Sequence, residues 1–236
     1  AHGQPNGRGT LRHRDGFVDE GIWTNGALIE TVTFLDGSKY KGEWRHGTAN
    51  GQGTFFLSNG DRYEGQFVDG KKSYGRYTYA NKDIYEGEFV DGKKHGRGRY
   101  TYANKEVYGG EFVNGNLQGH GKYTYKDGSV YEGEFKDGKK HGQGKITYKD
   151  GSVYEGAWVN DLPNGQGTLR HGDGFVDNGI WTNGILIQTV TFPNSSKYQG
   201  GWWHGMANGQ GTMTYPNGDR YEGQFLDSKR HGHGKY

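Results

Sequence analysis

The sequence contains no cysteine, which excludes a disulfide framework and a thiolate metal site. Only 30% of its 236 residues are hydrophobic, too few for one large globular core. No apolar run approaches the ~18 residues that a membrane-spanning helix needs. The 29 basic and 27 acidic residues alternate along the chain rather than cluster. No electrostatic footprint for a nucleic acid follows, and we expect no nucleic-acid partner.

Glycine and aromatic residues are abundant, and they recur with a fixed period. The chain has 46 Gly, 18 Tyr, 11 Phe and 6 Trp. The pentapeptide Tyr-Glu-Gly-Glu-Phe, or a close variant, begins at Tyr40, Tyr63, Tyr85, Tyr108, Tyr131, Tyr154, Tyr198 and Tyr221. Two further copies lose the tyrosine and begin at Asp19 and Asp177. Steps of 21 to 23 residues predict ten stacked units, each of which buries its apolar face only against its neighbours.

Turn dipeptides and two-residue alternation predict the secondary structure. Ten Asn-Gly and eight Asp-Gly pairs separate short alternating runs, and such pairs favour the two-residue turns of β-hairpins. Only seven alanines occur, and no helical periodicity is present. We therefore expect an all-β fold, an elongated single-layer antiparallel β-hairpin repeat array that curls into a trough.

Each hairpin is expected to have an aromatic face and a charged face. In one unit Tyr85, Gly87 and Phe89 share a face, while Glu86 lies on the other. The glycine is expected to leave room for an aromatic ring of the next strand. On the charged face, cross-strand pairs of opposite charge contribute about 0.2 to 1 kcal/mol each.

A longer repeat is superposed on the short one. Residues 6–67 match residues 164–225 at an offset of 158, with 46 of 62 positions identical. Residues 1–236 are therefore predicted to form one continuous array of about ten ~23-residue units, with a seven-unit super-repeat. Specialised units at about 15–38 and 173–196 carry an apolar strand in place of the Gly-x-Gly of the other units.

The apolar residues of the specialised units have two interpretations. They are either a better-filled bend in the trough or a docking patch for a partner strand or another array. The candidate patch consists of Phe17, Ile22, Leu28, Ile29, Val32, Phe34, Phe175, Ile180, Leu186, Ile187, Val190 and Phe192.

Basic pairs follow the same turn in several units. They are Lys71-Lys72, Lys93-Lys94, Lys139-Lys140 and Lys229-Arg230. A rim of such pairs could meet an anionic lipid surface, where each basic residue contributes about 1 kcal/mol. The alternative is that these are solvated turn residues, because other units lack the pair and acidic residues lie nearby.

No catalytic or metal-binding constellation is evident. His95, His141, His204 and His231 recur before Gly-x-Gly, but equivalent positions in successive units lie about 10 Å apart, too far to share one ion. The repeated glutamates all have the same environment, whereas acid–base catalysis needs two carboxylates in different environments. We expect no enzymatic activity and no cofactor.

The segment Tyr85 to Tyr100, Tyr-Glu-Gly-Glu-Phe-Val-Asp-Gly-Lys-Lys-His-Gly-Arg-Gly-Arg-Tyr, resembles a MORN (membrane occupation and recognition nexus) repeat. The resemblance covers eight units well, and those at Asp19 and Asp177 only in part. It implies a groove-shaped sheet of stacked hairpins that acts as a scaffold, dimerisation module or membrane-apposed adaptor. It also implies a cytoplasmic, cytoskeletal or membrane-apposed location.

The leading functional hypothesis is a non-enzymatic scaffold that binds protein partners or copies of itself. End-to-end continuation, within a longer chain or as a filament, is expected because the terminal units are as aromatic and glycine-rich as the others. One alternative is a peripheral module that binds membrane phospholipids through the lysine rim. Another is the recognition arm of a larger enzyme.

Overall fold

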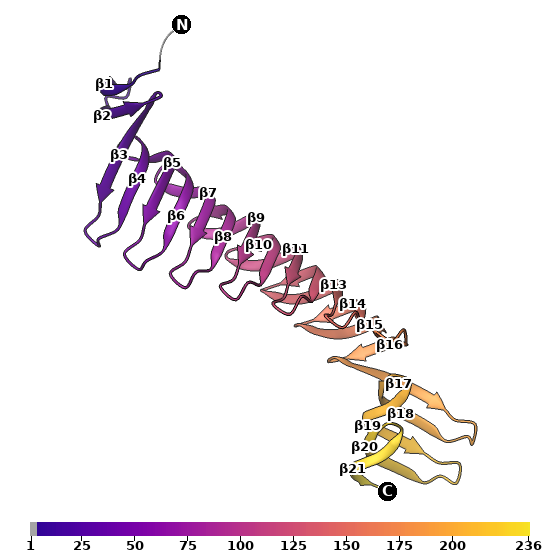
Figure 1. Ribbon diagram of the computed structural model, residues 1–236. Helices are drawn as coiled ribbons and strands as arrows, with labels where there is room; N and C mark the ends of the chain where they lie inside the picture. The colour runs from indigo at the N-terminus through magenta and orange to yellow at the C-terminus, as the bar shows by residue number, and fades with distance from the viewer. Residues whose placement is uncertain (1–3) are drawn as a thin grey trace. The chain divides into compact units, whose positions relative to one another are not determined.

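The computed structural model describes residues 4–236, and these residues form 21 β-strands and no helix (Figure 1). None of them belongs to a helix long and apolar enough to cross a membrane. The chain divides into two compact units, one ending at Gly119 and the other beginning at His120. Residues 1–3 of the predicted array lie outside the described residues.

The strands are 6 to 9 residues long. Those of the first unit are β1 (Gly7–Arg12), β2 (Val18–Thr24), β3 (Ala27–Thr33), β4 (Lys39–Arg45), β5 (Thr48–Phe56), β6 (Arg62–Val68), β7 (Lys71–Thr78), β8 (Ile84–Val90), β9 (Lys93–Thr101) and β10 (Val107–Val113). The division between the units falls within β11 (Asn116–Thr124). Those of the second unit are β12 (Val130–Lys136), β13 (Lys139–Thr147), β14 (Val153–Val159), β15 (Leu162–Arg170), β16 (Val176–Thr182), β17 (Ile185–Thr191), β18 (Lys197–Trp203), β19 (Met206–Thr214), β20 (Arg220–Leu226) and β21 (Lys229–Lys235).

Within each unit, every strand pairs antiparallel with the strand that follows it. The pairing runs from β1 to β10 in the first unit and from β12 to β21 in the second. In the first unit the hairpins succeed one another in chain order (Figure 1). The predicted all-β, single-layer antiparallel hairpin array is confirmed. That all ten repeats form one continuous array stays a prediction.

The hairpins close through two-residue turns in which both residues have positive φ. Asp91 and Gly92, for example, have φ of 47° and 75°. This is the geometry whose twist matches antiparallel strands, and it favours Asn-Gly and Asp-Gly. His46 and Gly47 adopt the same conformation without such a pair.

Not every Asn-Gly or Asp-Gly pair closes a two-residue turn, however. Asn59-Gly60 lies in a longer connection between β5 and β6, where the Leu57 N–H donates to the Asp61 carbonyl at 2.9 Å. There the Asn59 side chain accepts a hydrogen bond from the Asp61 N–H. Asn50-Gly51 lies inside β5. The same dipeptide therefore serves three local structures, selected by the pairing around it.

The core is a ladder of aromatic rings on one face of the sheet. The first tyrosine of the motif is almost completely buried, as in Tyr63 and Tyr85. Tyr63 lies edge-to-face with Phe67 of its own strand at 5.1 Å and with Phe89 of the next repeat at 5.4 Å. Tyr154 likewise contacts Trp158 at 5.1 Å and Trp181 at 5.2 Å. Each ring therefore joins two repeats in a favoured aromatic geometry.

The motif glycines make room for these tyrosines. A Cβ atom at Gly98 would lie 2.5 Å from the Tyr85 ring, and one at Gly87 would lie 2.5 Å from the Tyr85 hydroxyl. The prediction that the glycine admits a ring is correct. The expected source of the ring was wrong: it comes from the same strand, two residues before Gly87, because the tyrosine folds back over its own glycine.

A β-bulge, which was not predicted from the sequence, directly follows the motif glycine in strands such as β8, β12 and β20, and it comes one residue later in β6. In β8 and β9 the pairing steps from Gly87↔Gly98 to Glu88↔His95. The displaced Glu88 carbonyl accepts a hydrogen bond from the Tyr85 hydroxyl at 2.9 Å. The buried tyrosine therefore donates a hydrogen bond to the backbone at the bulge, where the regular ladder is interrupted.

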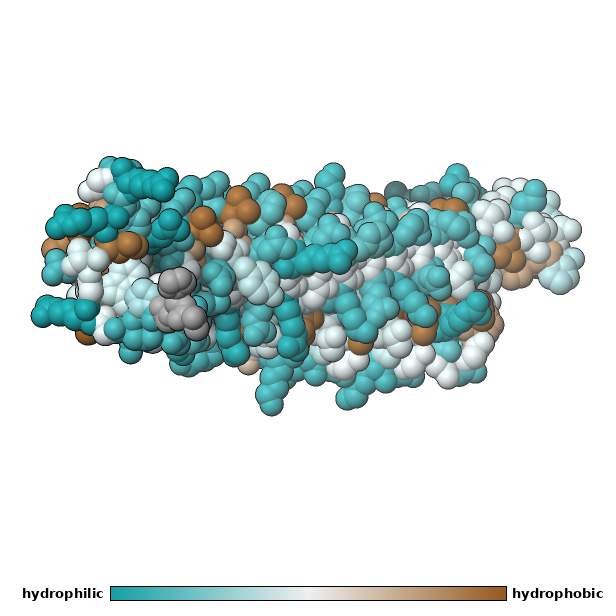
Figure 2. Space-filling view, turned by 90° about the horizontal axis from the view of Figure 1, so that it is seen from above, coloured by the Kyte–Doolittle hydropathy of each residue, from teal (hydrophilic) through white to brown (hydrophobic). Residues whose placement is uncertain are grey.

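The opposite face carries the predicted charges. Glu86 lies opposite Arg99, and the Glu86 carboxylate lies 3.5 Å from the Arg76 guanidinium. The space-filling view shows a largely hydrophilic surface in which hydrophobic residues form separate patches (Figure 2). Such exposed pairs contribute little to stability, so the aromatic face is the main source of cohesion.

Candidate interaction surface

The first specialised unit replaces the buried tyrosine of the motif with Asp19, and a leucine takes over the role of the ring. Leu28 is only 3% exposed, and its Cδ1 lies 2.7 Å from where a Cβ of Gly21 would be. Leu28 thus covers Gly21 as Tyr85 covers Gly87. The Trp23 indole N–H donates to the Gly9 carbonyl at 3.1 Å.

Asp19 is buried and is satisfied by two histidines. Its Oδ2 lies 2.8 Å from His13 Nε2, and its Oδ1 accepts the His46 backbone N–H at 3.2 Å. The two imidazoles lie edge-to-face, 4.2 Å apart, and Phe17 packs 5.4 Å from His46. Burial of a carboxylate requires such partners.

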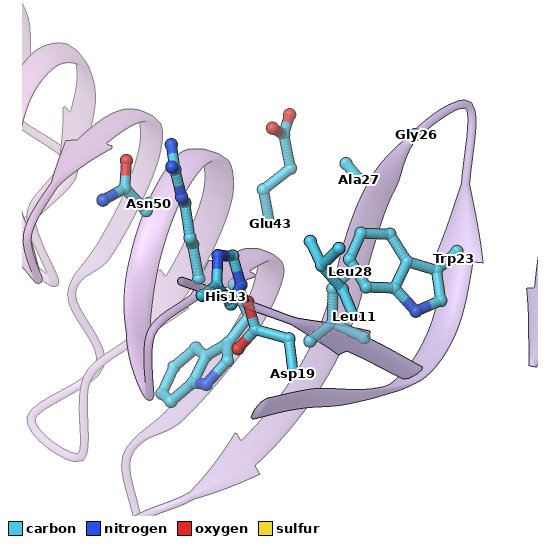
Figure 3. A pocket seen from close by; sticks show the side chains of 11 residues that line it. Leu11, His13, Asp19, Trp23, Gly26, Ala27, Leu28, Glu43 and Asn50 are labelled. Carbon is cyan, nitrogen blue, oxygen red and sulfur yellow. Dashed lines mark hydrogen bonds and ion pairs between the residues drawn. The ribbon is translucent and has the colours of Figure 1, made fainter. Parts of the chain in front are cut away.

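The residues around Asp19 line a cavity of ≈350 Å³. Figure 3 shows His13 beside Asp19, with Leu11, Leu28 and Trp23 on the other side of the cavity.

The second specialised unit repeats this cluster at the offset of 158 residues. His171 Nε2 lies 2.9 Å from Asp177 Oδ2, which accepts the His204 backbone N–H at 2.8 Å. His204 Nε2 also lies 2.7 Å from Asp173 Oδ2. Hydrogen bonds from Phe175 and His204 hold the pKa of Asp173 below its ordinary value. No group of three or more metal-ligating side chains able to hold an ion occurs among residues 4–236.

Strand pairing is short in both specialised units. β2 and β3 share three residue pairs, from Thr24↔Ala27 to Ile22↔Ile29, whereas β1 and β2 share six. β16 and β17 also share three, and the pairing ends at Ile180↔Ile187. The replacement of the Gly-x-Gly strand by an apolar strand therefore coincides with an interruption of the ladder.

The structure divides the candidate patch between core and surface. Leu28 and Leu186 are core residues, 3% and 1% exposed. Those exposed are Phe17, Ile22, Phe34, Phe175, Ile180 and Ile187. Those half-buried are Ile29, Val32, Val190 and Phe192. The isoleucines are cross-strand partners, Ile22 of Ile29 and Ile180 of Ile187. Alternation along the strands places them on one face of the sheet and the neighbouring tryptophan–leucine pairs, which are buried, on the other.

The basic pairs do not form a single rim, because their two members point to opposite faces. Lys71, Lys93 and Lys139 are exposed, and the Lys71 ammonium lies 3.0 Å from Asp91. The second lysines, Lys72, Lys94 and Lys140, lie over aromatic rings on the aromatic face, called the inner face below. Lys229 and Arg230 are both exposed, and the Arg230 guanidinium lies over Tyr221 and Tyr236.

Burial on the inner face shifts the pKa of the second lysines. Desolvation lowers the pKa of Lys72, Lys94 and Lys140, and a nearby aspartate opposes the shift in each case. This arrangement was not predicted from the sequence, although simple alternation along a strand indicates that neighbouring lysines face opposite ways.

The family model of the MORN repeat matches nine segments, residues 1–18, 40–62, 63–84, 85–107, 108–130, 131–153, 154–176, 198–220 and 221–236. This chain belongs to the MORN repeat family. MORN repeats are scaffold-type modules, and the array described above is of that type. Residues 19–39 and 177–197, which hold most of the two specialised units, lie between the matched segments.

Solved structures with some likeness to this MORN array include TCP domains. The TCP10 domain of Danio rerio CPAP is 15% identical, with 83% of this chain and 94% of that chain covered and a TM-score of 0.42. The SAS-4 TCP domain of Drosophila melanogaster, in complex with a proline-rich motif of Ana2, is 14% identical, with 82% and 88% covered and a TM-score of 0.35. A search of curated proteins finds no match.

Proposed function

We propose that this MORN array is a non-enzymatic scaffold that binds a protein partner through the outward-facing isoleucines of its specialised units. One observation carries the proposal. Ile22 lies opposite Ile29, and Ile180 lies opposite Ile187, on the face where standard repeats place charged pairs such as Glu86 and Arg99.

These isoleucines leave apolar area in water that a partner would cover. Ile22 is 63% exposed and Ile180 is 54% exposed, and Ile185 adds another exposed apolar side chain in the second unit. Burial of one isoleucine side chain contributes about 1.5 to 3 kcal/mol. The pairing ends at these residues, and beyond Ile180 the Gln188 side chain rather than a backbone neighbour donates to the Asn178 carbonyl. The exposed apolar area is what an apolar strand or loop of another protein would cover.

The experiment compares partner capture by matched variants. Ile22→Thr with Ile180→Thr keeps the β-branched shape but removes apolar area, and Val68→Thr with Val90→Thr makes the same change at exposed positions of standard repeats. We expect the isoleucine variant to lose the captured protein and the valine variant to retain it. Equal capture by the two variants would contradict the proposal. Binding to phosphoinositide vesicles that is lost in Lys71→Gln with Lys93→Gln would instead favour the phospholipid alternative.

A further inference from the structure

The inner face of the sheet contains aromatic cages that hold the array's own lysines. The Lys94 ammonium lies 4.2 Å from the ring centre of Tyr100, 5.6 Å from that of Phe112, and 6.0 Å from those of Tyr79 and Tyr85. An ammonium at these distances is attracted by the ring faces. Each wall comes from a different part of the repeat, so the cage recurs wherever the repeat supplies the same residues.

The second unit contains another filled cage of the same construction. The Lys140 ammonium lies 4.6 Å from the Trp158 ring and 5.7 Å from each of the Tyr125 and Tyr131 rings. Tyr131 and Trp158 are edge-to-face, 5.3 Å apart at 82°. Asp161 raises the pKa of Lys140 against the larger effect of burial.

One repeat further along, the walls are present and the lysine is absent. A shift of 23 residues converts Tyr125, Tyr131 and Trp158 into Tyr148, Tyr154 and Trp181, and it converts Lys140 into Pro163. Tyr154 and Trp181 keep the edge-to-face geometry, 5.2 Å apart at 82°. These three aromatics and Pro163 line a cavity of ≈510 Å³. The short, neutral proline ring supplies no cation to these three rings, and the Lys140 ammonium, which also lines the cavity, lies against Trp158 of the preceding cage.

We propose that this cavity is a receptor for one lysine side chain of a partner protein, which takes the place that Lys140 has in the preceding cage. The neighbouring repeat supplies the template, because it shows the same walls around a lysine ammonium. The site is independent of the isoleucine pairs, since Trp181 and Ile180 point to opposite faces of β16.

The charges that line the cavity also favour a cation. Asp150 and Asp161 contribute carboxylates, and Lys140 contributes the one ammonium among the lining residues, so these groups sum to one negative charge. His171 lies at the wall and is paired with Asp177. Trp203, half exposed at the rim, lies 4.7 Å from His171 and adds another ring face near the opening.

The test uses Nα-acetyl-lysine methylamide as the probe, with its norleucine analogue as an uncharged control of similar shape. Binding to the full chain is followed by NMR at the Trp181 indole N–H, which donates to the Gly167 carbonyl in the cavity wall. Pro163→Lys should fill the cage from within, as Lys140 does, and weaken probe binding at least about tenfold. Pro163→Ala should leave binding intact, because Ala49 and Ala207 occupy the equivalent position in other repeats.

A second variant protects the test against misfolding. Tyr148→Ala removes a half-exposed wall of the cavity and should also weaken binding of the lysine probe, without affecting the indole signal of Trp23, which does not line this cavity. The proposal is supported if the Trp181 indole signal shifts saturably with the lysine probe, does not shift with the norleucine analogue, and no longer shifts with the lysine probe in Pro163→Lys. No shift with lysine, equal shifts with both probes, or full binding by folded Pro163→Lys would each overturn it. None of these outcomes depends on whether the isoleucine variants capture a partner.

Discussion

Gly98→Ala tests whether the aromatic ladder depends on the absence of one methyl group. Gly98 has no left-handed backbone conformation, so the substitution adds no backbone strain. The new Cβ would lie 2.5 Å from Tyr85 Cε2 and Oη and 2.7 Å from Cζ, well inside the ordinary contact distance. All three nearest atoms belong to one buried ring.

The magnitude follows from what holds that ring. The Tyr85 hydroxyl donates to the carbonyls of Glu88 and His95 at 2.9 and 3.1 Å, and the ring lies 5.1 Å from Phe89 and 5.0 Å from Phe112. Overpacking of a filled core costs about 1 to 3 kcal/mol. A buried acceptor left unpaired costs about 1 to 3 kcal/mol more. We therefore expect Gly98→Ala to lower the free energy of unfolding by about 2 to 6 kcal/mol.

Hydrogen exchange at the amides of β8 and β9 is the suitable assay, because repeat arrays unfold in parts and one midpoint averages over them. Gly109→Ala is the matched control: it makes the same change in the neighbouring strand, where a Cβ meets nothing within 4 Å. Its effect should be small or slightly stabilising. In a Tyr85→Leu background, Gly98→Ala should cost much less, because leucine lacks the Cε2, Cζ and hydroxyl atoms that the new Cβ would meet.

Equal loss of protection in Gly98→Ala and Gly109→Ala would refute the reasoning, since a general intolerance of alanine in the strands would then explain both. Additive effects of Gly98→Ala and Tyr85→Leu would refute it as well, because the clash requires both partners.

Two further predictions concern the same packing. Burial raises the pKa of Tyr40, Tyr63 and Tyr198 to about 12. The stability that these neutral phenols contribute is therefore complete below the ordinary tyrosine pKa of about 10 and is lost as the pH rises from about 10 to about 12. The urea midpoint of unfolding should fall across that range. A midpoint that stays constant while phenolate absorbance appears would contradict this assignment. Glu134 accepts the Gln143 backbone N–H at 2.9 Å in the bulge, whereas Glu132 forms an exposed pair with Lys122. Glu134→Ala should therefore lower stability by about 1 to 2 kcal/mol and Glu132→Ala by less than about 1 kcal/mol, and denaturation curves with the opposite order would show that the carboxylate in the bulge does not stabilise it.

Much of the fold could be predicted because its determinants are local in the sequence. The Asp91-Gly92 pair specifies a turn with two positive φ values, and alternation around Tyr85 assigns the two faces. The bulge after Gly87 could not be predicted in this way. It accompanies the tyrosine folding back over its own strand, where its hydroxyl donates to the carbonyl of the bulged residue Glu88.

The candidate sites depended more strongly on tertiary structure. The 158-residue offset identified both specialised units, yet it could not show that Leu28 is core while Ile22 faces water. Nor could the period of 23 residues alone show a cage, because its walls come from a connection, from β14 and from β16. Sequence determined which residues recur and where Pro163 interrupts them. Only the packing of three successive repeats decided that the interruption leaves converging ring faces without a lysine of their own repeat, since ring faces separated in sequence must converge within a few ångströms to attract a cation.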